Sequence, residues 1–180
     1  MAKLRPARCC REPKKRAYTR KSKYQKKSYV KGIPGSKIVL FDMGNKSGCD
    51  KYEYRVSLIS QELKQIRHNS IESARMACVR RLNRLLGANN YYFKIKVFPH
   101  SIIREKPIAA GAGADRYSSG MKLSFGKATS TAAIVKPGQE IMYVGVNKQG
   151  AEKAKEALKK ASDKIGCKFK IEIREENVGI

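Results

Sequence analysis

Hydrophobic residues recur along most of this chain with the two periods of regular secondary structure, two residues in strands and about 3.6 in helices. Alternating or short apolar runs predict six strands, at residues 37–42, 52–59, 93–97, 101–104, 140–146 and 168–173. Helical spacing predicts a first helix, which contains Ile71, Ala74, Cys78, Leu82 and Leu85. The same spacing predicts a second, Lys-rich helix, which contains Ala151, Ala154, Leu158 and Ala161.

The first helix should begin at a side-chain cap, with Ser60, Asn69 and Ser70 as candidates, and should end at Gly87. Strands before, between and after two helices predict an α+β fold. We expect a two-layer domain in which a mostly antiparallel sheet is covered by two helices. A split βαβ arrangement would satisfy this pattern, and the strand order stays open.

Two segments do not fit the periodic pattern and divide the chain. Residues 1–31 form a basic N-terminal extension with few aliphatic side chains, and residues 32–180 form the α+β domain. Within the domain, residues from about 105 to 138 have almost no periodicity and are punctuated by glycines: Gly111, Gly113, Gly120 and Gly126. Structureless loops of this length are uncommon in compact domains, so we expect a long functional loop there.

The charge is strongly positive, with 40 Lys and Arg residues against 15 Asp and Glu residues, a formal net charge of +25 and a pI of about 10.1. Self-repulsion on this scale indicates a polyanionic partner. An anionic membrane, an acidic protein and a simply solvated basic face are alternatives. Nucleic acid is favoured, because phosphate neutralisation with counterion release rewards many dispersed cations.

Positive charge is densest in the N-terminal extension, where Glu12 is the single carboxylate. Tyr18, Tyr24 and Tyr29 lie among its basic residues and can stack on bases or sugars. We therefore interpret the extension as an RNA-binding segment that becomes ordered on contact. A disordered tail and a nuclear-import signal are the alternatives.

The sequence contains no recognisable catalytic, cofactor or metal-binding motif. The five cysteines are odd in number and lack C-x-x-C spacing, so we expect reduced thiols. The glycine-rich segment at residues 111–116 lacks the G-K-[ST] ending of a P-loop, and neither His68 nor His100 has triad spacing. No run of about 18 apolar residues is present, which predicts a cytoplasmic protein with no membrane contact.

Several separated blocks together resemble a known family. They are LRPARC at residues 4–9, AYTRK at 17–21, GIPGSKI at 32–38, IESAR at 71–75, FPH at 98–100, IREK at 103–106, AGADR at 112–116, SGM at 119–121 and SFGK at 124–127. On these residues the chain resembles the large-subunit ribosomal proteins called L-sixteen in bacteria and L-ten-e in archaea and eukaryotes, and looks like the archaeal–eukaryotic branch. Lys122 stands where the family commonly has Arg, and residues 128–130 replace a Pro-containing sequence.

The resemblance implies a ribosome-bound structural protein, not an enzyme, with no cofactor. Its implied partners are 23S-type rRNA, the vicinity of 5S rRNA, neighbouring large-subunit proteins and P-site tRNA. The long loop would point toward the peptidyl-transferase region and the acceptor end of that tRNA. The expected rRNA-binding residues are Arg5, Arg8, Arg11, Lys14, Lys15, Arg16, Arg20, Lys21, Arg75 and Arg104. The expected tRNA-proximal residues are Gly111, Gly113, Asp115, Arg116, Gly120, Lys122 and Lys127.

A free chromatin-like nucleic-acid-binding module and an RNA-modifying enzyme are the competing functions. Charge alone favours the first of them. The second would require catalytic turnover by the purified protein.

Overall fold

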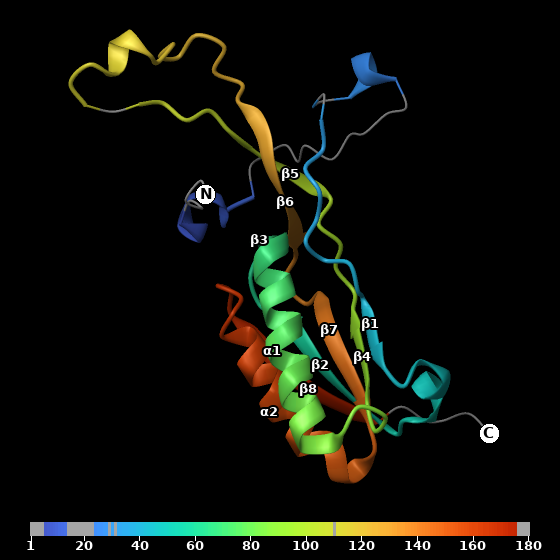
Figure 1. The fold of residues 1–180 in the computed structure, drawn as a ribbon. Coiled ribbons are helices and arrows are strands. Elements are labelled where there is room, and N and C mark those ends of the chain that lie inside the picture. Colours follow the sequence, from blue (N-terminus) through green and yellow to red (C-terminus); the bar gives the residue numbers. More distant parts are fainter. Residues whose placement is uncertain (1–5, 14–23, 29, 31, 110, 176–180) are drawn as a thin grey trace.

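The computed structural model describes residues 6–13, 24–28, 30, 32–109 and 111–175 (Figure 1). Its helices are α1 (His68–Leu86) and α2 (Ala151–Ser162). Its strands are β1 (Asp42–Gly44), β2 (Tyr54–Ser60), β3 (Lys64–Arg67), β4 (Tyr92–Ile95), β5 (Ser101–Glu105), β6 (Lys127–Val135), β7 (Glu140–Val146) and β8 (Phe169–Glu175). Short 3-10 helices are η1 (Ala7–Cys10), η2 (Gln25–Lys27), η3 (Lys46–Lys51), η4 (Ala114–Arg116) and η5 (Lys148–Gly150).

The main body consists of a five-stranded sheet with α1 and α2 packed on one face (Figure 1). The strand order is β1-β4-β7-β2-β8, and every neighbouring pair is antiparallel. Alternation along β2 turns Val56 and Leu58 toward the helices and leaves Arg55 and Ser57 on the opposite face. The sheet therefore has one buried, apolar face and one polar face.

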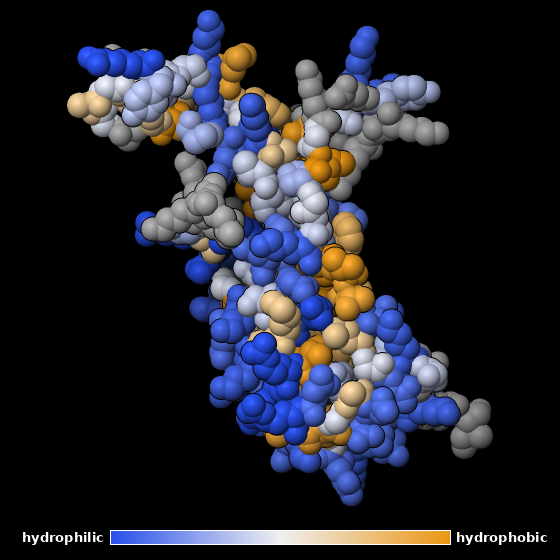
Figure 2. Space-filling view, viewed as in Figure 1, coloured by the Kyte–Doolittle hydropathy of each residue, from blue (hydrophilic) through white to orange (hydrophobic). Residues whose placement is uncertain are grey.

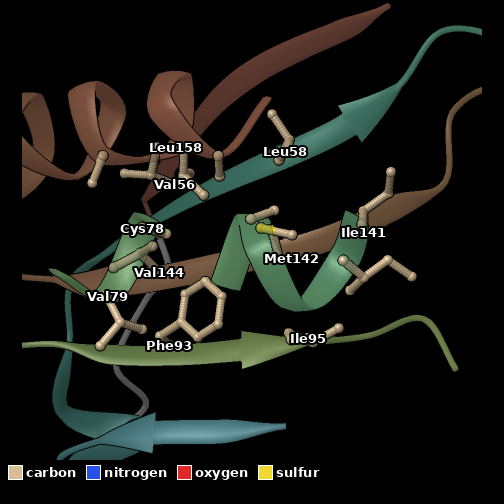
Figure 3. Packing of buried hydrophobic residues seen from close by; sticks show 14 of the residues in the cluster. Val56, Leu58, Cys78, Val79, Phe93, Ile95, Ile141, Met142, Val144 and Leu158 are labelled. Carbon is tan, nitrogen blue, oxygen red and sulfur yellow. The ribbon is translucent and has the colours of Figure 1, made fainter. Parts of the chain in front are cut away.

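The core lies between this sheet and the two helices (Figure 3). Val56 and Leu58 from β2 and Met142 from β7 are completely buried, and so are Cys78 from α1 and Leu158 from α2. Burial raises the pKa of the Cys78 thiol to about 12, so this cysteine is an unreactive packing residue. Cys78 and Cys167 are both free thiols, as expected; the side chains of the other three cysteines lie outside the described residues.

A second, three-stranded antiparallel sheet has the order β3-β6-β5. Its strands β5 and β6 form a hairpin that extends away from the helices and ends in a loop over residues 106–126, drawn in yellow in Figure 1. Because β6 pairs with β3 as well as β5, the hairpin is attached to the body through the strand that leads directly into α1.

The structure confirms the α+β class, the antiparallel pairing and the two covering helices. It corrects the expected loop at 105–138, since residues 127–135 are β6 and a second sheet is present. The reason is chemical: β6 is composed mainly of Ala, Thr and Ser, whose small side chains give little hydrophobic contrast. Pairing with strands on both sides, and not apolar alternation, specifies this strand.

Two further local predictions are wrong. Of the strand expected at 37–42, only Asp42 is in the sheet, because β1 runs from Asp42 to Gly44. Before β1, the backbone N–H groups of Lys37 and Ile38 donate to His68 Nδ1 and Ser36 Oγ, so side chains replace sheet partners. Helix α1 begins at His68 after Arg67, without a side-chain cap, instead of at Ser60, Asn69 or Ser70. The division at residue 31 stays a prediction, because most of residues 1–31 lie outside the described residues.

Substituting Leu158→Ala should lower the free energy of unfolding by about 2–5 kcal/mol, because it leaves a cavity between α2 and the sheet. Urea denaturation of the full chain measures this change. Leu63→Ala is the matched control: Leu63 is 51% exposed, so its truncation should change stability by no more than about 0.5 kcal/mol. Equal effects of the two substitutions would contradict the assigned core.

Candidate RNA interface

The first basic element is the segment of residues 6–13 in the N-terminal extension, which lies against the body. The backbone N–H of Gln65 in β3 donates to the Arg11 carbonyl oxygen at 2.6 Å. A Cβ placed on Gly166 would lie 2.5 Å from Arg11 Nη2, so the glycine leaves the room that this guanidinium occupies. Arg8 and Arg11 are both exposed. The other predicted cations of the extension lie outside the described residues: Arg5, Lys14, Lys15, Arg16, Arg20 and Lys21.

Arg75 is a predicted RNA-binding residue whose guanidinium already has partners within the body. Arg75 forms an ion pair with the Glu72 carboxylate, three residues earlier in α1. Arg75 Nη1 also donates to Met43 Sδ at 2.8 Å. The hydrogen bond from Arg75 to Glu72 raises the pKa of Arg75, so its charge is fixed. These contacts tie α1 to β1, and RNA contact by Arg75 stays a prediction.

The base of the hairpin loop is closed by contacts between the two strands. The Arg104 guanidinium stacks on the Phe125 ring, 3.8 Å from its centroid, and also donates to the Phe125 carbonyl oxygen. Lys106 Nζ donates to the Lys122 carbonyl oxygen. A Cβ on Gly126 would lie 2.9 Å from the Glu105 carbonyl carbon, so the two strands approach as closely as they do only because this residue is glycine. The loop therefore leaves the hairpin from a fixed base.

The tip of the loop is held by short turns. The N–H groups of Ala114 and Arg116 donate to the Gly111 and Gly113 carbonyl oxygens, each at 3.2 Å, and form η4. Arg116 and Lys122 are exposed, and so is Lys127, which lies opposite Glu105 at the start of β6. The Asp115 side chain lies outside the described residues. The hairpin thus carries the predicted tRNA-proximal residues, together with Arg104, on one projecting element, separate from Arg75 on α1.

Five exposed large apolar residues of the loop were not among the predicted site residues, and three of them are exposed by 70% or more. Tyr117 is 78% exposed, Met121 70% and Leu123 88%. Large apolar side chains gathered on one exposed loop are typical of a surface that binds a partner. Their sequence signal was weak, since apolar residues without a period predict neither a strand nor a helix.

The polar face of the five-stranded sheet is largely neutralised by its own carboxylates. Glu140 binds Arg55 at 2.6 Å and Lys96 at 2.7 Å, and it also accepts a hydrogen bond from Ser57. Burial would raise the Glu140 pKa, but hydrogen bonds from Lys96, Ser57 and Arg55 outweigh it and hold that pKa below its usual range. The Arg55 guanidinium also lies 3.8 Å above the Tyr143 ring. This face is a closed network of charges.

His68, the first residue of α1, binds the chain segment that precedes β1. Its Nδ1 accepts the Lys37 N–H at 2.9 Å, which requires that this nitrogen is unprotonated. Burial lowers the His68 pKa, and the charges of Lys37 and Arg67 lower it further. His100 is exposed, with its ring 4.7 Å from that of Phe98.

The described residues include no group of three or more His, Cys, Asp or Glu side chains that could hold a metal ion. No helix in this part of the chain is long and apolar enough to span a bilayer. Basic residues on an N-terminal segment and on a projecting hairpin, carried by a small α+β body, are typical of the structural proteins of ribonucleoprotein particles.

Comparison with known proteins specifies the family. The model of the family described as Ribosomal protein L16p/L10e matches residues 13–172. A large ribosomal subunit protein uL16 of Methanococcus maripaludis is 49% identical over 168 residues, which cover 93% of this chain and 92% of the relative. The protein of the same name from Staphylothermus marinus is 45% identical over 164 residues, covering 90% and 88%.

The chain therefore belongs to the L16p/L10e family of ribosomal proteins. This membership confirms the resemblance inferred from the sequence and its archaeal character. It also confirms that the chain is a ribosome-bound structural protein and not an enzyme. Contacts of individual residues with RNA remain predictions.

Lowering the pH from 7 to 5 should reduce the free energy of unfolding in part through His68. Its native pKa lies below the unfolded value of about 6.5, so the unfolded state binds more protons as the pH falls through this window. Stability is therefore lost toward acid. Denaturation of His68→Asn, which keeps a hydrogen-bond acceptor but cannot titrate, should show a weaker pH dependence. A wild-type slope in His68→Asn would contradict the assignment.

Substituting Gly126→Ala should destabilise the hairpin more than Gly120→Ala. Both glycines have positive φ angles, +74° and +54°, so each alanine introduces backbone strain of about 1–2 kcal/mol. Only at Gly126 does the new Cβ meet backbone atoms, those of Glu105, whereas no atom lies within 4 Å at Gly120. Hydrogen exchange of the β5 and β6 amides measures the difference. Equal exchange in the two variants would show that the close approach at Gly126 does not hold the hairpin.

Proposed function

We propose that this chain is a structural constituent of the large ribosomal subunit that binds 23S-type rRNA and helps to organise the tRNA corridor near the peptidyl-transferase centre. In this proposal the N-terminal extension and the body hold the chain on rRNA, near 5S rRNA and neighbouring large-subunit proteins. The loop over residues 106–126 then reaches the acceptor end of P-site tRNA. The names of the relatives, large ribosomal subunit protein uL16, support the assignment to that subunit.

The observation that carries the proposal is the construction of the hairpin. Its base is closed by Arg104, Phe125 and Gly126, while its tip exposes Tyr117 and Leu123. A fixed base aims the loop in one direction, and an exposed tip costs stability unless a partner covers it. This division is the one expected for an element that reaches from a protein body into an RNA cavity.

The chemistry of the tip suits RNA. The Tyr117 ring can stack on a base or ribose, and such stacking does not require a particular sequence. Arg116 and Lys122 are exposed and can neutralise phosphates. The role of the loop in this proposal is to position RNA, while the reaction belongs to the RNA itself.

Replacing residues 108–121 with a short Gly-Ser linker should separate binding to the subunit from tRNA handling. The base contacts of Arg104 and Lys106 remain, so the variant should fold and co-sediment with large subunits through a moderate-salt wash. Its subunits should bind P-site tRNA more weakly, measured by filter binding. A matched pair of point variants sharpens the test: Tyr117→Ser should weaken tRNA binding, whereas Val39→Ser, at an equally exposed site of the body, should not.

Normal tRNA binding by the linker variant would refute the role of the loop. Failure of the folded variant to enter subunits would contradict the division between a body that binds rRNA and a loop that contacts tRNA. A wild-type chain that is found free or on DNA, and not on large subunits, would refute the proposal as a whole.

A further inference from the structure

Helices α1 and α2 lie side by side on the sheet and are joined by an ion pair between Arg81 and Glu156 at 2.6 Å (Figure 1). Where α2 ends, a hollow of about 360 Å³ opens between the two helices. It is lined by Ala77, Arg80, Arg81, Arg84, Lys160, Asp163 and Lys164. We call this hollow the interhelical groove.

Helical periodicity explains the groove. Ala77, Arg80, Arg81 and Arg84 are spaced three or four residues apart, so they share one face of α1. Ala77 has the shortest of these side chains and forms a low floor between the long arginines. Lys160 and Lys164 stand four residues apart on the opposite side of the groove. The result is two rows of cations: the arginines of α1, with about 5–6 Å between the Cβ atoms of neighbours three or four residues apart, and facing them Lys160 in α2 and Lys164 just after it.

Most cations of the groove have no carboxylate partner among the described residues. Arg81 binds Glu156, but Arg80, Arg84, Lys160 and Lys164 form no ion pair with any other described residue. Asp163 is the single carboxylate among the lining residues. The surface over α1 and α2 is accordingly strongly hydrophilic in Figure 2.

The polar face of the sheet provides an internal contrast. There, Glu172 binds Lys170 at 3.1 Å and Arg174 at 2.8 Å, and Asp42 lies 3.6 Å from Lys94. Carboxylates are scarce in this chain. On the sheet they pair with the cations, whereas among the described cations of the groove Arg81 alone forms an ion pair. Mutual repulsion among the groove cations disfavours the free state, and a bound anion removes it.

We propose that the interhelical groove binds the sugar–phosphate backbone of folded rRNA, as a contact separate from the N-terminal extension and the hairpin loop. The inference rests on the proposed function and names one rRNA-binding surface of the body. The guanidinium forks of Arg80 and Arg84 match phosphate oxygens, and the lysines supply charge from the opposite wall. An acidic peptide fits less well, because the lining offers only Ala77 as an apolar contact and peptide grooves need apolar anchors.

The test uses the full chain and transcribed large-subunit rRNA, with binding measured by filter retention between about 50 and 200 mM KCl. The groove variant carries Arg80→Gln, Arg84→Gln, Lys160→Gln and Lys164→Gln. The matched control carries Lys94→Gln, Lys168→Gln, Lys170→Gln and Arg174→Gln, which removes equal charge from cations that have carboxylate partners. In the groove variant, the slope of log affinity against log salt should flatten by about 0.7–0.9 for each phosphate that the groove no longer neutralises. The control should keep the wild-type slope.

Equal flattening in the two variants would show that only net charge matters and would overturn the proposal. An unchanged slope in the groove variant, with wild-type binding intact, would overturn it as well. If the wild-type chain itself fails to bind this rRNA, it is the proposed function that fails. Loss of a neighbouring acidic protein from subunits, with rRNA binding unchanged, would assign the groove to that partner and overturn the rRNA proposal.

A second variant keeps the charge and changes the shape. Ala77→Leu fills the floor of the groove while the net charge stays at +25. It should weaken rRNA binding severalfold without changing the thermal unfolding temperature by more than a few degrees. Wild-type affinity in folded Ala77→Leu would contradict a phosphate backbone seated between the two rows of cations.

Discussion

Electrostatic repulsion is the constraint that organises this molecule, because 40 basic side chains are opposed by only 15 acidic ones. The polar face of the sheet is neutralised internally, with Glu140 and Glu172 each bound to two cations. A compact apolar core on the other face then holds the body together. Exposed cations are left on the N-terminal segment, on the helices and on the hairpin. The stability of the body and its attraction for polyanions thus depend on different surfaces.

The second sheet attaches a projecting hairpin to this body. Strand β6 pairs with β3, which leads directly into α1, so the hairpin is continuous with the helical layer. At its far end the stacking of Arg104 on Phe125 closes the base of the loop and frees the tip. Membership in the L16p/L10e family places this arrangement in the ribosome. The interhelical groove would provide the first of these contacts and the loop the second.

Local sequence patterns predicted the elements whose side chains alternate strongly between buried and exposed. Helices α1 and α2 and strands β2, β7 and β8 were found in this way, and so was the glycine-rich tip of the loop. Strand β6 was missed because Thr131, Ala132 and Ala133 are consecutive buried residues, and partners distant in sequence specify the strand. The groove and the base of the loop could not be predicted for the same reason. Arg84 and Lys160 meet only through helix packing, and Arg104 lies 21 residues from Phe125.

The arrangement of these surfaces on RNA can be observed directly in an electron-microscopy map of large subunits that contain this chain, with and without P-site tRNA. The account predicts that Arg80 and Arg84 face an rRNA backbone in both maps. It also predicts that residues 106–126 lie against the acceptor end of the tRNA when it is bound. A map in which the helical layer faces solvent and the hairpin points away from the tRNA would contradict the account.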